Sequence, residues 1–489
     1  MNTKPFFKNL QLFFMTVVAV PLSLDKAVID TLKNNLDAKI SFVQVGENQA
    51  KTKSADAAFN SSGSLYINRT TSIEKTGSFF GETTRDKQFD FTASFTKPFR
   101  TGDLIQLQLR STRLETNSFF YSINPSHDAE LSLYAESPLF RRSREDIVTA
   151  GVKLAKINED ISFEEYRARV LDLLSTVITR YWQLVRSLKR LEVVNKNITV
   201  QKSLLDITRK KKEIGLVSPR ELLRVESLYE EARLAVTNAV QELENIHDQM
   251  KILMNLKNDD FFNTEFNPTT YPDFPDTMPS VNPLLEAAYS NRPDVRQMKL
   301  FLAEENINLD IARDNTLPDI KLVGSLGTNA LGKTYPDMAS DLVSGEFYTA
   351  NIGIKIDFPF SSEAARSNLQ ASELRKSEYE LKVEQLSQKV LVDIRTSVRN
   401  LIIARQKREA SLSQLKFTSR TLEIEREMLI EGLSYPQQVM ESAHKKLLSE
   451  ENLIDAETEY FIELVRLEQH AGILLNRWNI DIKRYYEEK

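Results

Sequence analysis

The sequence contains no cysteine and few glycines or prolines, and these absences narrow the possible classes of protein. Without cysteine, the chain of 489 residues has no disulfide framework, no thiolate metal site and no catalytic thiol. Its 14 glycines and 16 prolines fall below the average usage of about 7 % and 5 %. Because these residues interrupt helices and strands, their scarcity predicts long uninterrupted elements.

Long apolar runs and blocks of like charge are also missing. No stretch approaches 18 consecutive apolar residues, so a location within a membrane would require a β-barrel rather than a helix. The net charge is -5, and basic and acidic residues are interspersed. This pattern provides no basic surface for nucleic acid, which is therefore not expected as a partner.

The residues that usually carry catalysis are scattered. The four histidines show no paired ligand spacing, and the chain has no phosphate-binding glycine loop and no nucleophile elbow. We therefore predict no catalytic, cofactor-binding or metal site, and no enzymatic activity.

The N-terminus has the pattern of a secretory signal. Lys4 and Lys8 precede a mainly apolar run from Leu10 to Leu22, and a weak small-residue cleavage site lies near Ala19. This indicates a signal sequence over residues 1–20 and export of the chain. The alternative is a buried N-terminal strand.

An internal duplication organises the rest of the chain. Pro359 lies 221 positions after Pro138, and Gly432 lies 217 positions after Gly215 in a similar turn. An earlier pair of landmarks, at Asp37 and Asp294, is offset by about 36 more residues, which is about the size of one β-hairpin. The first copy therefore has a surplus between its first helix and Pro138.

The duplication predicts the domain boundaries. Each copy should contain a helix of about 30 residues, a strand region and a long helical hairpin, with long helices at roughly 144–214 and 362–431 that reach about 100 Å each. The first repeat is predicted at 21–256, with strands at about 62–140 and a helical hairpin at 141–256. The second repeat is predicted at 284–480, with strands at about 318–360 and a helical hairpin at 361–480, and a tail follows at 481–489. Between the repeats, a proline-rich linker at 257–283 is expected to lack regular helix and to wrap the outside as a belt.

Apolar and polar residues alternate in the predicted strands, with one apolar and one polar face. This is the pattern of a strand with lipid on one side and water on the other, although a soluble β-sandwich shows it too. The positions predicted to face lipid are Ile105, Leu107, Leu109, Ile352, Ile354 and Ile356.

One chain has too few strands to close a barrel, and open sheet edges cannot face lipid. Several copies must therefore share one barrel. Three chains would give 12 strands with four each, or 18 with six each if a hairpin between Arg85 and Glu115 joins the wall.

The turns of the helical hairpins carry specific chemistry. Gly215 can end one helix in a left-handed conformation, and Ser218, Pro219 and Glu221 can begin the next; Ser434 and Gln437 offer the same capping device after Gly432. The apical Leu216 and Leu433 either pack back onto the helix or dock a partner. Charges of opposite sign precede the two turns and could latch a closed pore end; they are Arg209, Lys210, Lys211 and Lys212 in the first hairpin and Glu423, Glu425, Glu427 and Glu431 in the second.

Together these features resemble the TolC family of outer-membrane efflux proteins over nearly the whole chain. The resemblance is carried by Asn291-Arg292-Pro293-Asp294, the strand exits at Pro138 and Pro359, and the Gly-Leu turns at Gly215 and Gly432; the first copy departs from it with Leu36 in place of the proline. It implies a mainly α-helical fold with transmembrane β-structure, in which duplicated helical hairpins form a periplasmic tunnel and three chains share a β-barrel in the outer membrane of a Gram-negative bacterium.

The resemblance also implies partners. A homotrimer in outer-membrane lipid would dock a periplasmic adaptor, or membrane fusion, protein through its helical tips, and indirectly an inner-membrane pump. The docking residues carried over to this chain are Gly215, Leu216, Val217, Gly432, Leu433 and Ser434. The implied function is a passive exit duct for efflux or type I secretion, gated at the tips. Because a wide polar duct needs no substrate pocket, the sequence specifies no cargo.

A second hypothesis remains open at this point. On the first long helix, apolar residues such as Leu184, Leu191 and Leu205 follow the spacing of a coiled-coil seam, as do Leu415 and Leu422 on its counterpart. An envelope-spanning or cytoplasmic coiled-coil scaffold without a pore would show the same pattern.

Overall fold

The computed structural model describes residues 18–75, 83–270, 274, 279–480 and 482. They form two compact units. The first unit contains residues 1–44, 162–297 and 383–489, and the second contains residues 45–161 and 298–382. Several helices have residues in both units.

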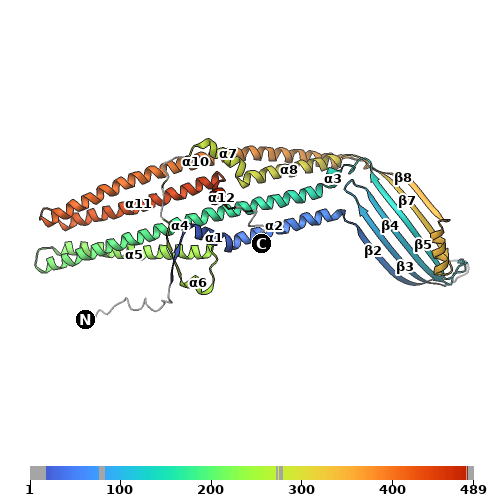
Figure 1. The fold of residues 1–489 in the computed structure, drawn as a ribbon, viewed down its shortest axis with the longest axis horizontal. Helices are drawn as coiled ribbons and strands as arrows, with labels where there is room; N and C mark the ends of the chain where they lie inside the picture. The colour runs from blue at the N-terminus through green and yellow to red at the C-terminus, as the bar shows by residue number, and fades with distance from the viewer. Residues whose placement is uncertain (1–17, 76–82, 271–273, 275–278, 481, 483–489) are drawn as a thin grey trace. The chain divides into compact units, whose positions relative to one another are not determined.

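Two long helical hairpins dominate the first unit (Figure 1). They are built from α4 (Ala150–Glu213) with α5 (Pro219–Leu253), and from α10 (Glu363–Ile430) with α11 (Pro436–His470). Small apolar clusters hold the helices together, for example Val194 of α4 with Ala239 of α5 and Leu447 of α11. At about 1.5 Å per residue, α4 and α10 are each about 100 Å long, as the scarcity of glycine and proline predicts.

Several short elements accompany the hairpins of the first unit. Strand β1 (Val18–Leu22) pairs in parallel with β6 (Thr264–Pro268), and the fully buried Tyr181 of α4 fixes this pair. Its hydroxyl donates to the Leu22 carbonyl at 3.1 Å and accepts from the Thr270 amide at 2.9 Å. The other short helices of this unit are α1 (Leu24–Asn34), α6 (Asn258–Asn263), α7 (Val281–Asn291) and α12 (Leu474–Arg477).

Aromatic residues attach the proline-rich segment to the long helices. The Trp182 and Phe461 rings stack with centroids 4.2 Å apart, and Phe274 tilts onto Phe461 at 4.8 Å. The Arg408 guanidinium lies 3.6 Å from the centroid of Phe274. Contacts of this kind stabilise an aromatic cluster beyond the burial of its area.

The second unit contains one six-stranded antiparallel sheet. The strands lie in the order β2-β3-β4-β5-β7-β8, and Figure 1 shows them side by side. Their bounds are Ser62–Lys75, Thr83–Pro98, Leu104–Thr116, Ser126–Pro138, Asp319–Gly332 and Tyr348–Asp357. The smaller elements are η3 (Ala57–Phe59), α3 (Glu145–Val148) and α9 (Tyr335–Ser344).

The strands continue into helices that this unit shares with the other. Helix α2 (Leu36–Asp56) leads into β2 and α8 (Pro293–Asp314) leads into β7, while β5 and β8 lead into α4 and α10. Strands β3 and β4 connect only to other strands. Their turn is anchored instead by side chains: Arg100 pairs with Asp56 at 2.5 Å, and Lys97 donates to the Phe59 carbonyl at 2.9 Å.

The duplication predicted from the sequence is present in the order of elements. In each copy, two consecutive helices lead through strands to a long helical hairpin. The surplus of the first copy is the β3–β4 hairpin, which lies inside the sheet between β2 and β5. The hairpin predicted between Arg85 and Glu115 therefore lies within the sheet, which has six strands.

Four details differ from the sequence-based expectations. The single first helix of each copy is broken in two, at Asn35 and at Arg292. The proline-rich linker is not free of helix, because α6 precedes its first proline and α7 begins at Val281. Between β7 and β8 the chain forms α9, which was not predicted. Residues 18–20 of the predicted signal sequence belong to β1, and the rest of that segment, Pro272, Pro275 and most of the tail lie outside the described residues.

Among the described helices, none has the length and apolar character needed to cross a membrane.

Candidate functional sites at the helical tips and on the sheet

The first helical tip, between α4 and α5, is a tight turn fixed by backbone hydrogen bonds. Gly215 has a φ of 75°, and the Leu216 amide donates back to the Lys211 carbonyl at 2.9 Å. This closes the end of α4 in the manner of a Schellman motif. Ser218 caps α5, because its side chain accepts from the Glu221 amide at 3.3 Å. The predicted left-handed glycine, the cap by Ser218 and the proline in the first turn of α5 are confirmed at this tip.

The second tip, between α10 and α11, closes in the same way but begins its returning helix differently. Gly432 has a φ of 78°, and the Leu433 amide donates to the Met428 carbonyl at 2.8 Å. The predicted cap of Ser434 with Gln437 is wrong by one residue, since Tyr435 occupies the N-cap and its amide donates to Gln438 at 3.4 Å. The buried Ser434 hydroxyl instead contacts Glu425 and Gln438, at 2.7 Å each.

Both apical leucines project into solvent. The side chains of Leu216 and Leu433 are 71 % and 67 % exposed, so they do not pack back onto their helices. Ile214, Ile430 and Tyr435 are exposed beside them and were missed in the sequence. Exposed apolar groups gathered at two equivalent turns are typical of an interaction surface.

The charged runs behind the tips form ion pairs within their own hairpins. Arg209 pairs with Glu226 at 3.0 Å in the first hairpin, and Arg420 pairs with Glu423 at 3.1 Å in the second. Within the described part of the chain, no ion pair joins the run at 209–212 to the glutamates at 423–431. The predicted latch between them stays a prediction about contacts between chains.

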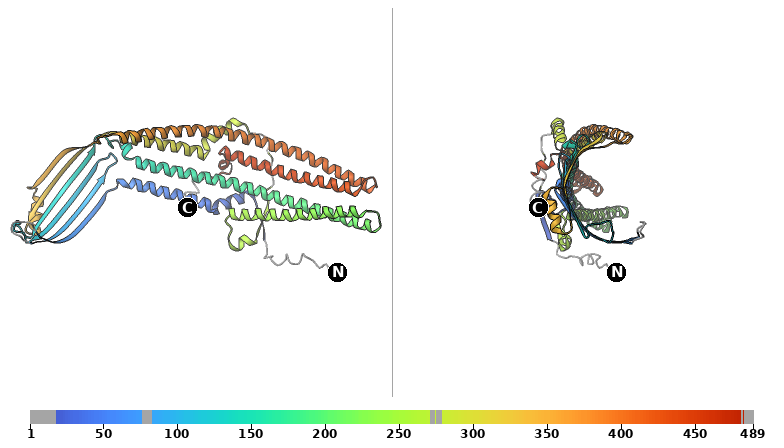
Figure 2. Two further views of the ribbon diagram at one scale, coloured as in Figure 1. Left: turned by 180° about the vertical axis from the view of Figure 1, so that it is seen from behind. Right: turned by 90° about the vertical axis from the view of Figure 1, so that its right-hand side faces the viewer.

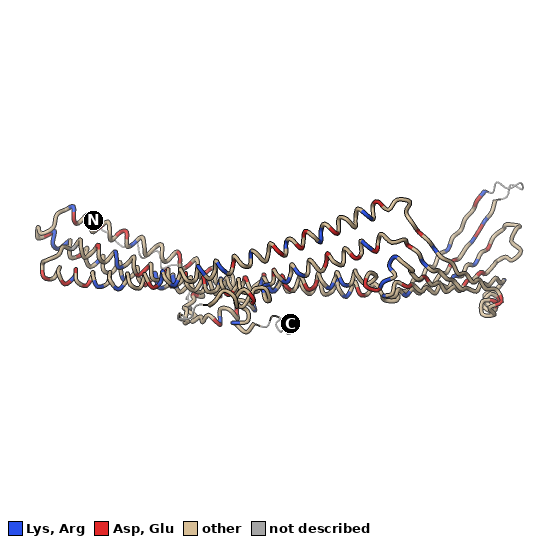
Figure 3. Tube along the Cα trace, turned by 90° about the horizontal axis from the view of Figure 1, so that it is seen from above, with Lys and Arg blue, Asp and Glu red and all other residues tan. Residues whose placement is uncertain are grey.

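Further from the tips, a network of ion pairs joins α4, α5 and α11. Arg186 contacts Asp455 at 2.5 Å and Glu242 at 2.6 Å, and Arg190 contacts Glu242 at 2.9 Å and Glu451 at 3.1 Å. Partial burial by itself would lower the pKa of Arg186, but the hydrogen bonds and charges of its carboxylate partners raise this pKa overall. The guanidinium therefore stays charged and links the two hairpins. Figure 3 shows the charges dispersed along the helices.

The Asn-Arg-Pro-Asp segment that resembles the family motif has a structural task. Arg292 is buried at the break between α7 and α8, where it contacts Asp294 at 2.7 Å and Asp393 at 3.1 Å. Burial would lower the pKa of Arg292, but these hydrogen bonds raise it overall. In the first copy Asn35 occupies the equivalent break, and its side chain donates to the Leu253 carbonyl at 3.1 Å. The residue at each helix break therefore contacts a long-hairpin residue of the same copy of the repeat.

The sheet has one apolar and one polar face. Its register places Leu65, Ala93, Leu109 and Leu131 in one row across four strands, so their side chains lie on the same face. All six positions predicted to face lipid lie on this face: Ile105, Leu107, Leu109, Ile352, Ile354 and Ile356.

The opposite face carries hydrogen-bonded polar groups. Glu136 of β5 accepts from Lys321 of β7 at 2.7 Å and from the Tyr134 hydroxyl at 2.8 Å. Asp90 of β3 accepts from Thr112 of β4 at 3.0 Å. Charged and amide side chains on every strand make this face suited to contact with water.

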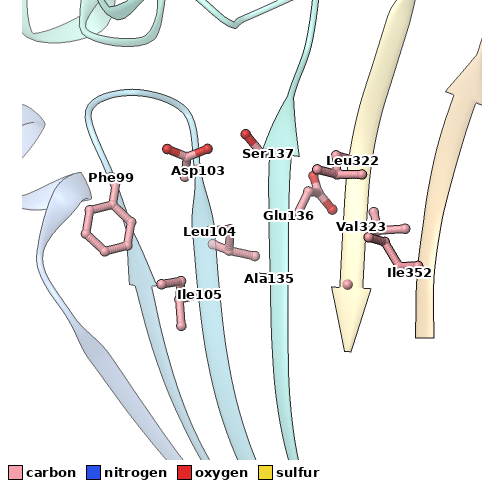
Figure 4. A pocket seen from close by; sticks show the side chains of 11 residues that line it. Phe99, Asp103, Leu104, Ile105, Ala135, Glu136, Ser137, Leu322, Val323 and Ile352 are labelled. Carbon is pink, nitrogen blue, oxygen red and sulfur yellow. The ribbon is translucent and has the colours of Figure 1, made fainter. Parts of the chain in front are cut away.

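A shallow hollow of about 370 Å³ lies on the sheet near its helical end (Figure 4). It follows the cross-strand row of Ile105, Ala135, Gly324 and Ile352, in which two small residues lie between two large ones. Most of its lining is apolar, so the hollow is an irregularity of the apolar face rather than a reaction site.

Three of the four histidines take part in local packing. His247 contacts the Phe266 carbonyl at 3.3 Å, His470 contacts the Ser397 hydroxyl at 2.7 Å, and the His127 ring lies 4.1 Å from that of Tyr335. Burial lowers the pKa of His247 and of His470.

Comparison with known proteins assigns the class. The sequence model of the outer membrane efflux protein family matches residues 105–255 and 284–473, which is more than half of the chain. The chain therefore belongs to the outer membrane efflux protein family, a family of channels rather than of enzymes. This confirms the resemblance drawn from the sequence. Among curated proteins, none matches the chain.

Solved structures of outer-membrane proteins share the fold. The Campylobacter jejuni CmeC outer membrane channel has a TM-score of 0.69 and 19 % identity, with 92 % of this chain and 85 % of that chain covered. For VceC of Vibrio cholerae the TM-score is 0.68 and the identity 15 %, with 92 % and 96 % covered. For the open state of the Neisseria gonorrhoeae MtrE outer membrane channel, the TM-score is 0.61 and the sequence identity is 17 %, with 92 % of this chain and 88 % of that chain covered.

Proposed function

We propose that this chain is one subunit of a homotrimeric channel in the outer membrane of a Gram-negative bacterium. The channel extends into the periplasm and is the passive exit duct of a tripartite efflux or type I secretion system. A periplasmic adaptor protein docks to its helical tips and connects it to an inner-membrane pump, which supplies the energy. Lipid surrounds the sheet.

The observation that carries this proposal is the two-faced, open sheet. Within the described sheet, β2 and β8 each pair along one side only, and unpaired backbone groups are costly in lipid. Pairing β2 of one chain with β8 of the next closes the sheet and leaves no edge. Three copies give a barrel of 18 strands with the polar face inside.

Recordings of single-channel current test the duct directly. The purified trimer in a planar lipid bilayer should conduct ions, because the polar face would line a water-filled pore. A chain that is monomeric in detergent-free solution, or a folded trimer that never conducts even after the tip charges are removed, would support the scaffold hypothesis and refute the channel.

The exposed tips support the adaptor-docking part of the proposal. Replacing Leu216→Asp together with Leu433→Asp should abolish export, because a carboxylate at each apex cannot enter an apolar pocket. The trimer should remain intact, since neither side chain is packed. The control is Arg220→Asp, which introduces a carboxylate at an exposed position beside the tip without removing an apolar group or a residue of the basic run. Full export by the double variant would refute docking through these leucines.

The charged runs support gating at the tips. If the glutamates of one hairpin attract the basic run of another chain, Glu427→Gln with Glu431→Gln should raise the basal conductance of the closed channel. Both side chains are exposed, so their neutralisation should leave the fold unchanged. Unchanged conductance would remove the electrostatic latch from the proposal.

A further inference from the structure

Helix α9 is a fixed element in the connection between β7 and β8. Thr334 caps its start, donating from its hydroxyl to Asp337 Oδ2 at 2.7 Å and accepting from the Asp337 amide at 3.4 Å. Gly345 ends it in a left-handed conformation with a φ of 69°. Because both ends are defined, the segment has a stable face toward the sheet and a stable face away from it.

The helix packs on the apolar face of the sheet. The Ser111 hydroxyl contacts the Met338 sulfur at 3.9 Å, and the Thr328 hydroxyl donates to the Leu342 carbonyl at 3.3 Å. The register places Ser111 on the same face as Leu109, and Thr328 on the same face as Leu131. Figure 2 shows the orange helix on the convex side of the curved sheet.

Small residues make room for this packing. Ala129 and Ala330 lie opposite each other beneath the helix and are almost fully buried. At Gly332, an added Cβ would lie only 2.6 Å from the Met338 backbone nitrogen. The close approach therefore depends on this glycine.

The helix covers polar groups at the end of the apolar face. Thr328 lies in the same cross-strand row as Leu109 and Leu131, and beyond that row the same face continues with Ser111 and His127. All three polar residues contact α9. Polar groups that face hydrocarbon without partners are costly. Helix α9 contacts these polar groups and covers them, so that the outer side of the helix, rather than the polar groups, faces outward at this end of the sheet.

One exposed stripe along α9 is apolar at helical spacing, while Ser340 and Ser344 are exposed beside it. Tyr335, Ala339 and Val343 follow one another at intervals of four, and all three are exposed. Val343 is 86 % exposed, and the exposed Phe347 follows the helix. Toward the sheet, Met338 and Leu342 are half-buried. A valine held in open water by a rigid helix would lose the burial that apolar side chains favour.

We propose that α9 is a lipid-contacting helix, lying on the outside of the sheet in the outer leaflet with Tyr335, Ala339 and Val343 against the acyl chains near the headgroups. This inference rests on the proposed function, because it requires that the apolar face of the sheet meets lipid. A tyrosine and a phenylalanine at one end of the apolar band are typical of the aromatic girdle at a membrane interface. The helix thereby extends the lipid-facing surface beyond the point where the strands become polar.

The absence of native cysteine permits a clean labelling experiment. Val343→Cys, labelled with an environment-sensitive fluorophore, is compared in the full-length channel with Ile352→Cys on the apolar face and Asn351→Cys on the polar face. The channel is reconstituted in phosphatidylcholine and phosphatidylglycerol vesicles that carry a doxyl quencher either near the headgroup or deep in the acyl chains. Ala339→Cys provides a second position on the same stripe.

The expected result is a blue-shifted emission at positions 343 and 339, with stronger loss of signal to the shallow quencher than to the deep one. The probe at 352 should be quenched and the probe at 351 should not. Water-like emission without quenching at 343 and 339, while 352 is quenched, would overturn the role of α9 and indicate a helix at the mouth of the pore. If 352 also escapes quenching, the proposed membrane location of the sheet itself is refuted.

Discussion

The two copies of the repeat differ most in what they insert between their framing strands. The first copy inserts β3 and β4, which enter the sheet between β2 and β5. The second copy inserts α9, which leaves β7 and β8 paired directly and lies on the face of the sheet instead. One insertion therefore widens the sheet by two strands, and the other thickens it locally.

The periodicity of each insertion explains the difference. The hairpin alternates apolar and polar residues, as at Phe89, Phe91 and Phe95, and so matches both faces of the existing sheet. Residues 335–344 have a capping threonine, a terminal glycine and an apolar stripe at intervals of four. In a strand, Met338 and Leu342 would lie on the face opposite to Ala339 and Val343, so the apolar side chains would be divided between the two faces.

The largest expected effect comes from removing the hairpin. Deletion of residues 83–116 should bring β2 beside β5 with their apolar rows still on one face, because the register keeps Leu65 in the row of Leu131. A trimer would then have 12 strands, and since barrel diameter grows roughly linearly with strand number, the pore would narrow by about a third. Polymer-exclusion measurements from the sheet side of the channel check this. An unchanged exclusion size would mean that the hairpin does not line the barrel.

Arginine substitutions compare the lipid contacts of the two insertions. Leu107→Arg on the hairpin should impair membrane assembly by up to about 2–4 kcal/mol, whereas Val343→Arg on α9, near the interface, should cost about 0–1 kcal/mol. Gln108→Arg on the polar face is the matched control and should be tolerated. The measurement is the fraction of heat-resistant folded channel after reconstitution. Equal tolerance at positions 107 and 108 would contradict the assignment of the faces.

The turn of the hairpin should be more sensitive to an added methyl group than the end of α9. Gly102 has a φ of 94°, and an added Cβ would lie 2.6 Å from the Arg142 carbonyl oxygen. Gly345 also has a positive φ but has open space around it. Gly345→Ala should therefore cost only the backbone strain of about 1–2 kcal/mol, and Gly102→Ala should cost more. Thermal unfolding of the two variants measures the loss of stability in each. A larger loss in Gly345→Ala than in Gly102→Ala would contradict the prediction.

The smallest expected effect is a local one at the seat of α9. Gly332→Ala should displace the helix, because the added Cβ has no room beside Met338, while Gly324→Ala on the same strand meets nothing closer than 3.8 Å. Assembly and conductance should be retained in both variants. Limited proteolysis or hydrogen exchange of residues 335–344 should increase only in Gly332→Ala. Equal protection in both would show that the helix is not held by this approach.

Sequence reasoning was most successful where the signal is local. The two turns at Gly215 and Gly432 each close with a left-handed glycine and a backward hydrogen bond from the next leucine, as their residues predict. The alternation in β4 and β8 also sufficed to assign side chains to faces. The local sequence did not correctly predict the N-cap of α11, because the Ser434 hydroxyl contacts Glu425 of the preceding helix.

The sequence by itself determined the duplication, the long helices, the hairpin turns and the two-faced strands, because each follows from spacing or composition within a short stretch of chain. Only the tertiary structure decided that the extra hairpin joins the middle of the sheet, that α9 covers its apolar face, and that Arg186 links the two helical hairpins. These depend on which distant segments become neighbours. Pairing of strands and seating of a helix are fixed by register and by small residues such as Gly332, and no periodicity in one segment specifies its partner.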